Sequence, residues 1–412
     1  FKEGDWISLD GGTGEVFEGA LGTVSADYDE QDDLKTVLGW ADEIRRMEVW
    51  TNADKPEEAE RARAYGAQGI GLCRTEHMFR EGERLEIVRG AILVSAAAMR
   101  ARAKQEAGAL LEAEERAAID TFDGAMAKLE ALQQGDFEGI FEAMKSLPVV
   151  VRLIDPPLHE FLPNLEETLV EVTKAGDAAT AEQKELLAIV QSMHEQNPML
   201  GLRGVRLGLM IPDFVKIQTR AILNAQVAVN KRGGDAIAKI MIPLVGHVNE
   251  LSRVRGLLEA EADAIAEKSG VTLDYKFGTM IEIPRGALTA DEIAKEASFF
   301  SFGTNDLTQM AFGYSRDDAE GGFLLKYVEE KVLPFNPFQT IDATGVGQLV
   351  EIAVQKGRAT RPDIELGVCG EHGGDPESIH FFERVGLDYV SCSPFRVPVA
   401  RLAAAQAVLE NK

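Results

Sequence analysis

The stretch FGTMIEIPRGALTADEIAKEASFFSFGTNDL, residues 277–307, contains one complete unit of the predicted fold. Two apolar runs, at 277–284 and 299–307, enclose a segment with helical spacing at 291–297. Apolar runs that are almost uninterrupted are typical of parallel strands buried on both faces. The stretch therefore predicts a strand, a helix and a second, parallel strand.

The same alternation recurs along most of the chain. The predicted strands lie at 48–53, 69–76, 148–155, 201–208, 239–245, 277–284, 299–307 and 365–371. Helical patterns lie between them at 56–65, 212–231, 248–268, 291–297 and 344–360. Repeated strand–helix units of this kind predict an α/β fold, namely a (β/α)8 TIM barrel, with a doubly wound open sheet as the alternative.

Longer segments interrupt or precede this alternation. Helical insertions are predicted at about 80–147 and 158–198, and because each follows a strand, both are expected to project from the rim of the barrel. Ahead of the barrel, two β-type runs flank the glycine-rich residues 11–14 and predict a hairpin. Residues 317–323 are expected to form a mobile loop.

Composition narrows the classes of partner. The 412 residues carry a formal net charge of -25, which argues against nucleic acid or an anionic membrane as the main partner. A local arginine cluster or a bound cation can still attract a small anion. No transmembrane or signal segment is predicted, and three widely spaced cysteines indicate a reducing, cytoplasmic compartment. Because the sequence begins with Phe1 rather than Met, we expect a fragment.

Two carboxylates end consecutive predicted strands, where barrels of this kind hold functional residues. Glu282 closes the strand at 277–284 and Asp306 closes the strand at 299–307, so the two side chains are expected to converge. Either carboxylate alone would be interpreted as a helix cap or an ion-pair partner. As a pair they predict a Mg²⁺ site, because Mg²⁺ takes one or two carboxylates together with water and substrate oxygens.

Arginines accompany three of the predicted strands. Arg74, Arg152 and Arg203 lie on or beside buried strands, where an unpaired charge is costly. The planar guanidinium fork suits phosphate and carboxylate groups, so the three arginines predict an anion site opposite the metal. The alternative is structural pairing with Asp155, Glu76 or Glu160. It is strongest for Arg203, since Arg206 is an equal candidate.

The remaining candidates lie at the ends of the last two predicted strands. Gly303, Thr304 and Asn305 offer backbone N–H groups and an amide that can hold a carboxylate, or they serve only to permit an unusual turn. Cys369 has no second soft ligand and no partner thiol at a suitable spacing. Its position suits a group that moves a proton beside a metal-stabilised enolate of an α-keto acid.

Several motifs carry a resemblance to a known family, from about Gly4 to the end of the chain. Together they resemble the phosphoenolpyruvate-binding barrel of the pyruvate, phosphate dikinase family. Phosphoenolpyruvate (PEP) synthase and Enzyme I of the sugar phosphotransferase system share only a shorter GTNDL and CGE/CGQ core, whereas DPPLHEFLP and CGEHGGDP favour the dikinase. The motifs are GLCRTEHMF (71–79), VRLIDPPLHEFLP (151–163), GLRGVRLG (201–208), MIEIPR (280–285), SFGTNDLTQM (301–310) and GVCGEHGGDP (367–376).

The resemblance implies an activity and a set of roles. The family interconverts ATP, phosphate and pyruvate with AMP, pyrophosphate and PEP, and a histidine on a swivelling domain carries the phosphoryl group. The implied roles are phosphoryl contacts (Arg74, Arg152, Arg203), Mg²⁺ ligands (Glu282, Asp306), positioning of pyruvate or PEP (Gly303, Thr304, Asn305) and proton transfer at the methyl carbon (Cys369).

The resemblance also predicts how the chain is organised. Residues 1–25 would be the tail of the phosphohistidine domain, and residues 26–412 the PEP-binding barrel of a homodimeric enzyme. The ATP-binding domain and the carrier histidine would lie upstream, so this chain would bind PEP without completing the full reaction. Two other functions stay open: a Mg²⁺-dependent lyase or aldolase acting on an α-keto acid, and a non-catalytic interaction module.

Overall fold

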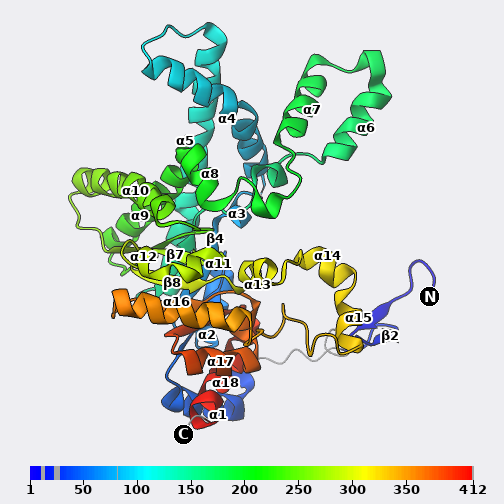
Figure 1. Ribbon diagram of the computed structural model, residues 1–412, viewed down its shortest axis with the longest axis vertical. Coiled ribbons are helices and arrows are strands. Elements are labelled where there is room, and N and C mark those ends of the chain that lie inside the picture. Colours follow the sequence, from blue (N-terminus) through cyan, green and yellow to red (C-terminus); the bar gives the residue numbers. More distant parts are fainter. Residues whose placement is uncertain (11–13, 23–27, 81, 411–412) are drawn as a thin grey trace.

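The computed structural model describes residues 1–10, 14–22, 28–80 and 82–410, and its centre is a closed barrel of parallel strands (Figure 1). The last barrel strand, β10, pairs both with its predecessor β9 and with β3, the first strand of the barrel. The barrel prediction is therefore confirmed, and the alternative of an open sheet is wrong. In spatial order the strands are β10 (Tyr389–Cys392), β3 (Glu48–Asn52), β4 (Ile70–Arg74), β5 (Pro148–Arg152), β6 (Ile237–Ile242), β7 (Tyr275–Ile281), β8 (Phe299–Phe302) and β9 (Glu365–Val368).

One predicted strand is wrong and one strand was missed. Residues 201–208 do not join the sheet, because the chain turns at Gly204, whose φ is 56°, and continues as the helix α8 (Gly204–Met210). The alternating Val205 and Leu207 are both buried, but in a helix above the barrel rather than in a strand. The barrel is completed instead by β10, which lies beyond the last predicted strand.

Local sequence signals account for the helices that cover the barrel. α17 is typical: Asp375 accepts a hydrogen bond from Ser378 N, Pro376 starts the helix, and Gly386 ends it in the left-handed region. Of the helix predicted at 291–297, only the start is helical, as α12 (Ala290–Ile293), which follows the short helix α11 (Pro284–Leu288). The covering helices are α1 (Asp32–Ile44), α2 (Pro56–Ala64), α9 (Pro212–Lys231), α10 (Val248–Ser269), α11 (Pro284–Leu288), α12 (Ala290–Ile293), α13 (Thr304–Phe312), α16 (Val346–Thr360), α17 (Pro376–Val385) and α18 (Val397–Glu410).

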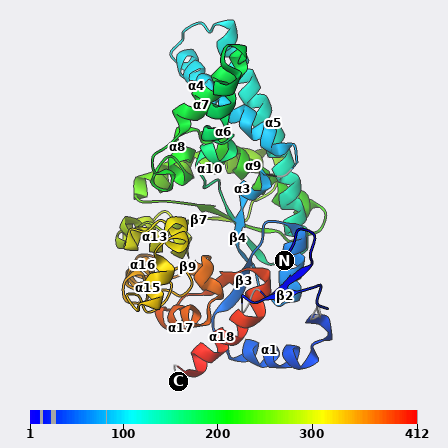
Figure 2. The ribbon, with the colours of Figure 1, turned by 90° about the vertical axis from the view of Figure 1, so that its right-hand side faces the viewer.

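Both predicted insertions form helical pairs that project beyond the strands (Figure 2). The first contains α4 (Arg84–Glu106) and α5 (Ala113–Met144), and the second contains α6 (Leu165–Ala175) and α7 (Ala181–Met193). A short helix, α3 (Thr75–Met78), follows β4 directly. Both insertions therefore begin at the end of the barrel at which the strands finish. The carboxyl-terminal part of α5 returns along the outside of the barrel, where Phe137, Phe141 and Met144 are buried.

The loop expected at 317–323 is mostly helical. Residues 316–321 form α14 (Arg316–Gly321), and α15 (Leu324–Glu329) follows it. The acidic residues Asp317 and Asp318 occupy the first turn of α14, where the helix dipole favours negative charge. Ala319, Leu324 and Phe338 form a small buried cluster that holds this segment together.

Side chains that point into the barrel form a core of their own, separate from the large core between strands and helices. In its centre Trp50 stacks on Tyr389 with ring centroids 3.9 Å apart. Near the amino-terminal ends of the strands, the buried Lys239 makes hydrogen bonds of 2.6 and 2.8 Å to Glu365. Cys369 also belongs to this inner core. The barrel is thus filled below the level at which Cys369 lies.

The amino-terminal hairpin is confirmed as two antiparallel strands, β1 (Ile7–Leu9) and β2 (Val16–Glu18). Most of its predicted turn, residues 11–13, lies outside the described residues. Within the part of the chain that the structure describes, no helix combines the length and the apolar character needed to cross a membrane.

Candidate active site

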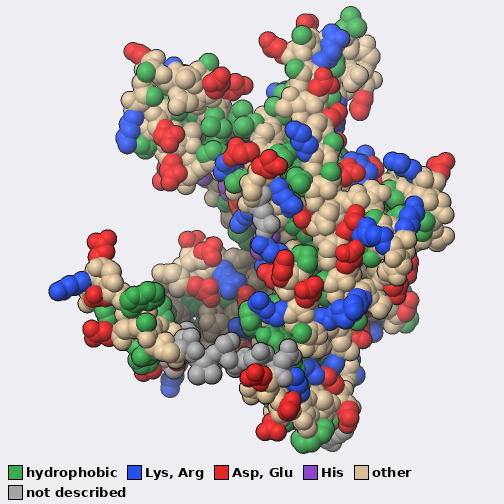
Figure 3. Space-filling model, turned by 180° about the vertical axis from the view of Figure 1, so that it is seen from behind, with side chains coloured by type: hydrophobic (Ala, Val, Ile, Leu, Met, Phe, Trp, Pro, Cys, Tyr) green, Lys and Arg blue, Asp and Glu red, His purple; other side chains and the backbone are tan. Residues whose placement is uncertain are grey.

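A cavity of about 300 Å³ opens at the carboxyl ends of the barrel strands. Its mouth lies between Glu160 and Met199 on the side of the α6–α7 pair and Arg316 on α14, and Figure 3 shows the molecule hollowed between these two projections. A second cavity of about 460 Å³ adjoins it and shares Arg152, Asn305 and Cys369 with it. The predicted site residues that line the first cavity are Arg152, Arg203, Glu282, Gly303, Asn305, Asp306 and Cys369.

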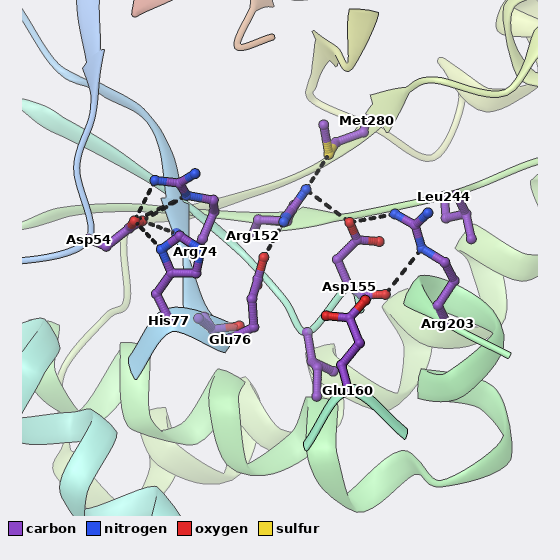
Figure 4. A network of polar contacts seen from close by, with 12 residues as sticks. Asp54, Arg74, Glu76, His77, Arg152, Asp155, Glu160, Arg203, Leu244 and Met280 are labelled. Atoms are coloured by element: carbon purple, nitrogen blue, oxygen red, sulfur yellow. Dashed lines mark hydrogen bonds and ion pairs between the residues drawn. The ribbon is translucent and has the colours of Figure 1, made fainter. Parts of the chain in front are cut away.

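A chain of ion pairs joins Arg152 and Arg203 beside this cavity (Figure 4). Arg152, from the end of β5, pairs with Glu76 and lies 3.0 Å from Asp155. Arg203 lies 2.7 Å from Asp155 and 3.1 Å from Asp306. Burial would raise the pKa of Asp155, but Arg152 and Arg203 outweigh it and hold that pKa below its usual value. Asp155 is therefore an ionised bridge between two cations.

Arg74 is held separately and lines the second cavity. Its Nη2 and Nε donate to Asp54 at 2.6 and 3.0 Å, and His77 Nδ1 lies 2.8 Å from the same carboxylate. Burial opposes the ionisation of Asp54, yet His77 and Arg74 lower its pKa below the usual range. Because the Arg74 side chain is 36% exposed, its guanidinium can also meet an anion from solvent.

Glu282 is buried at the end of β7 and carries the most crowded carboxylate of the site. Burial raises its pKa well above the usual value, and the charges of Asp306 and Asp155 raise it further. Leu244 N donates to Glu282 Oε1 at 2.6 Å. A Cβ at Gly303 would lie only 2.4 Å from Glu282 Oε2, so the space for this carboxylate exists because residue 303 has no side chain.

The turn after β8 is fastened to the turn after β9. His372 is fully buried, with Nε2 2.9 Å from the Pro337 carbonyl and Nδ1 2.7 Å from Thr304 Oγ1. Burial lowers the pKa of His372, so the neutral ring donates from Nε2 and accepts the Thr304 hydroxyl proton at Nδ1. Asn305 Oδ1 accepts from Glu371 N at 3.2 Å. The hydroxyl of Thr304 therefore helps to hold the two turns together, and Thr304 lines neither cavity.

Cys369 lies where the two cavities meet, at the end of β9. Its side chain is only 3% exposed, and Asn52 Nδ2 donates to its backbone carbonyl at 3.0 Å. Burial raises the pKa of the Cys369 thiol to about 11, although Ser301 and Arg152 act in the opposite direction. At neutral pH the group is thus a thiol that can donate a proton.

Comparison with known proteins identifies the family. Residues 28–409 match the family described as "PEP-utilising enzyme, PEP-binding domain". The chain belongs to this family of PEP-utilising enzymes. The cavity at the carboxyl ends of the strands is therefore the candidate active site of a PEP-utilising enzyme.

Similar members of the PEP-utilising family are dikinases. The chain is 51% identical over 411 residues to the chloroplastic pyruvate, phosphate dikinase of Flaveria pringlei, covering 99% of this chain and 40% of that protein. It is 49% identical over 413 residues to pyruvate, phosphate dikinase of Clostridium symbiosum, covering 100% of this chain and 44% of that protein. The chain thus spans less than half the length of these relatives. A citrate lyase structure from Burkholderia xenovorans aligns with a TM-score of 0.31 at 12% identity, covering 58% of this chain and 72% of that chain.

The structure places further residues at this candidate site that the sequence did not single out. Arg316 lines the first cavity, and its backbone N–H donates to Gln309, which in turn donates to Asp306 at 3.0 Å. Arg316 starts a helix rather than following a strand, so the strand-end rule could not find it. Asp54 lies two residues after the end of β3, so the strand-end rule could have found it. Arg206 donates to the carbonyls of residues 200 and 201 and lines neither cavity, so Arg203 is the better candidate.

The raised pKa of Cys369 predicts an unusual pH dependence of its reaction with iodoacetamide. Because only the thiolate reacts, the alkylation rate should keep rising by about tenfold per pH unit between about pH 7 and 9.5. No plateau should appear in this range, because the pKa is raised to about 11. Peptide mass mapping separates Cys369 from Cys73 and Cys392, which are also buried. A plateau below pH 9 would show that the thiol is more acidic than its burial implies.

Proposed function

We propose that this chain is the PEP- and pyruvate-binding catalytic part of a pyruvate, phosphate dikinase. In this function a phosphoryl group passes from a phosphohistidine to the enolate of pyruvate to give PEP. The observation that carries the proposal is one cavity in which an arginine, two carboxyl groups and a neutral thiol meet, namely Arg152, Glu282, Asp306 and Cys369. The similarity to dikinases over almost the whole chain supports it.

The arginines supply the anion site of the proposal. Arg74 and Arg152 border the second cavity from two neighbouring strands, so a phosphoryl group between them would meet two guanidinium forks. Arg203 and Arg316 border the first cavity and extend the positive charge toward the rest of the substrate. Each of these arginines already contacts a carboxylate, so the substrate anion would share cations that the protein holds in place.

The charges of the site fit a divalent cation. Four acidic side chains, those of Glu76, Asp155, Glu282 and Asp306, lie around Arg152 and Arg203, which leaves two more acidic groups than arginines. Two of the carboxylate oxygens, Glu76 Oε2 and Asp155 Oδ1, are buried without a hydrogen-bond partner. Crowding of like charges and unpaired oxygen acceptors are what a hard cation relieves.

We propose that Glu282 and Asp306 hold Mg²⁺. Among the described residues, no group of three or more His, Cys, Asp or Glu side chains is placed to hold a metal ion. A pair of carboxylates suffices for Mg²⁺, because it keeps several waters and takes oxygens from the substrate. When bound, the cation would stabilise negative charge on the enolate oxygen of pyruvate. Gly303 and Asn305, which line the same cavity, would position the pyruvate carboxylate together with the nearby turn of Thr304.

Cys369 would move the proton that the reaction requires. In the direction of pyruvate formation, its neutral thiol would donate a proton to the methylene carbon of the enolate, and in reverse it would accept one from the methyl group. Its burial keeps the proton on sulfur at neutral pH, and its place between the cavities puts it next to both anion and carboxylate groups.

The organisation of the whole enzyme belongs to the same proposal. Residues 1–25 would be the tail of a phosphohistidine domain, residues 26–412 would form the PEP-binding barrel, and ATP-binding and phosphohistidine domains would make up the rest of a cytoplasmic homodimer. A two-stranded hairpin is marginally stable alone, and Trp6 and Leu9 on it are 75% and 70% exposed, which supports a partner for this segment. The greater length of the dikinase relatives agrees with further domains.

A calorimetric titration of this chain with PEP tests the proposal. We expect binding in the presence of Mg²⁺ and its loss in the presence of a chelator. Turnover of an α-keto acid by the chain alone, without nucleotide, would favour a lyase or aldolase instead. Failure to bind PEP with Mg²⁺ would leave a non-catalytic interaction module as the better description.

A further inference from the structure

Arg203 holds the carboxylate that the proposed function assigns to the metal. Its side chain is 5% exposed, and a single nitrogen, Nη2, lies 2.7 Å from Asp155 and 3.1 Å from Asp306. The other terminal nitrogen makes only long contacts, 3.5 Å to the Met199 carbonyl and 3.7 Å to its sulfur. The guanidinium is therefore firmly fixed on the Asp155 side, and within the described part of the chain its second amino group has only these long contacts.

Both oxygens of Asp306 are engaged by donors from the protein. Oδ2 receives Arg203, and Oδ1 receives Gln309 Nε2 at 3.0 Å. A divalent cation that binds Asp306 comes close to the guanidinium, and two cations repel strongly in a buried site. One of the two contacts must then weaken. The Gln309 amide is neutral, so the contact with Arg203 is the one that a cation opposes.

We propose that Arg203 is an internal cation that a divalent metal displaces from Asp306, so that metal binding frees the guanidinium for the anionic substrate. Asp155 stays bound to Arg203 in both states and serves as the pivot. This inference rests on the proposed function, and it adds a coupling between the two ligands. By linkage, whatever metal binding contributes to substrate affinity, substrate binding contributes equally to metal affinity.

The arrangement has a physical advantage over a static arginine. Without ligands, Arg203 limits the repulsion between Asp155 and Asp306, which lie on either side of the same nitrogen. With metal present, the displaced guanidinium carries its charge into the first cavity, which it already lines. The site would thus favour an anion only after the cation has bound, and the two ligands would bind cooperatively.

Binding of Mn²⁺, followed by electron paramagnetic resonance, measures this coupling in the full 412-residue chain. In the unsubstituted chain, PEP should tighten Mn²⁺ binding. In Arg203→Met, Mn²⁺ alone should bind at least about fivefold more tightly, because its ligand is no longer occupied, and the enhancement by PEP should shrink by at least the same factor. Unchanged or weaker binding of Mn²⁺ alone by this variant would overturn the inference.

Two controls separate displacement from simple loss of a positive charge. Arg206→Met removes a neighbouring arginine that contacts only backbone carbonyls in the structure, and it should leave Mn²⁺ affinity unchanged. Arg203→Lys keeps the charge, but its shorter side chain ends before the position of Nη2, the nitrogen that meets both Asp155 and Asp306. It should therefore show the same direction of change as Arg203→Met. A gain in the methionine variant alone would indicate a general electrostatic effect and contradict displacement.

A crystal structure of the unsubstituted chain with Mn²⁺ but without PEP gives a readout that does not depend on folding of a variant. Displacement requires that Arg203 leaves Asp306 and keeps Asp155. Persistence of the Arg203–Asp306 contact beside a bound Mn²⁺ would refute the inference while leaving the proposed function intact. Absence of both Mn²⁺ and PEP binding in solution would instead remove the proposed function itself.

Discussion

Replacing Cys369 by alanine is expected to abolish exchange of the pyruvate methyl protons with solvent and to leave PEP binding nearly intact. Positioned acid–base groups contribute roughly 10²–10⁴-fold to a rate, so the exchange should fall by about that factor. The anion contacts should survive, because the Cys369 side chain forms none of the ion pairs that hold Arg74, Arg152 and Arg203.

Proton NMR of pyruvate in D₂O with Mg²⁺ and the full-length enzyme measures this exchange, and calorimetry measures PEP binding. Cys73→Ala is the matched control, because Cys73 is equally buried but belongs to the core outside the barrel. Exchange at the unsubstituted rate in Cys369→Ala would exclude Cys369 as the proton carrier. Loss of PEP binding together with exchange would point to a structural role for the thiol.

Replacing Arg152 by methionine is expected to damage both stability and binding. Glu76 and Asp155 are buried partners of this arginine, and removing one member of a buried ion pair typically costs about 3–5 kcal/mol. The free energy of unfolding, measured with urea, should fall by about this amount. PEP binding should disappear, since Arg152 borders both cavities.

Two further variants make the prediction for Arg152 specific. Arg232→Met removes an exposed arginine that pairs with Glu138 and Glu142, and it should change stability little. Combining Arg152→Met with Glu76→Gln should recover part of the lost stability, because residue 76, which has lost its arginine partner, is then uncharged. PEP binding should not be restored. Equal stability losses in Arg152→Met and Arg232→Met would contradict the buried network described for Arg152.

The sequence predicted most of the barrel because its parallel strands are buried on both faces and read as continuous apolar runs. It failed at residues 201–208, where Val205 and Leu207 alternate like a strand but lie in α8. It also missed β10, a four-residue strand with Ser391 in its centre, which lacks such a run. The alternation of side chains did correctly separate Cys73, in the outer core, from Arg74, which faces a cavity.

Residue types at strand ends located most of the candidate site, but they did not predict which of its side chains contact one another. The strand-end rule brought Glu282, Asp306 and Cys369 to one cavity. Asp155 and Glu76 were expected as alternative partners of the arginines, and both pairings are present. The sequence could not show that Arg203 shares Asp155 with Arg152, since that depends on side-chain geometry across strands and loops. It also could not assign the hydroxyl of Thr304 to His372, because that contact joins two separate turns. Whether the site residues act as proposed stays a prediction.

The pairing of the first and last barrel strands has a consequence for biosynthesis. β3 can find its second neighbour only after residues 389–392 have been synthesised, and α1 and α18 are joined only then by the ion pair between Arg401 and Asp42. Until that moment the nascent barrel exposes two open strand edges, which are templates for aggregation. A premature stop just ahead of β10 would therefore produce an aggregation-prone chain that still contains every proposed active-site residue. For this protein, quality control in the cell would have to recognise the unpaired edges of β3 and β9 rather than a defective active site.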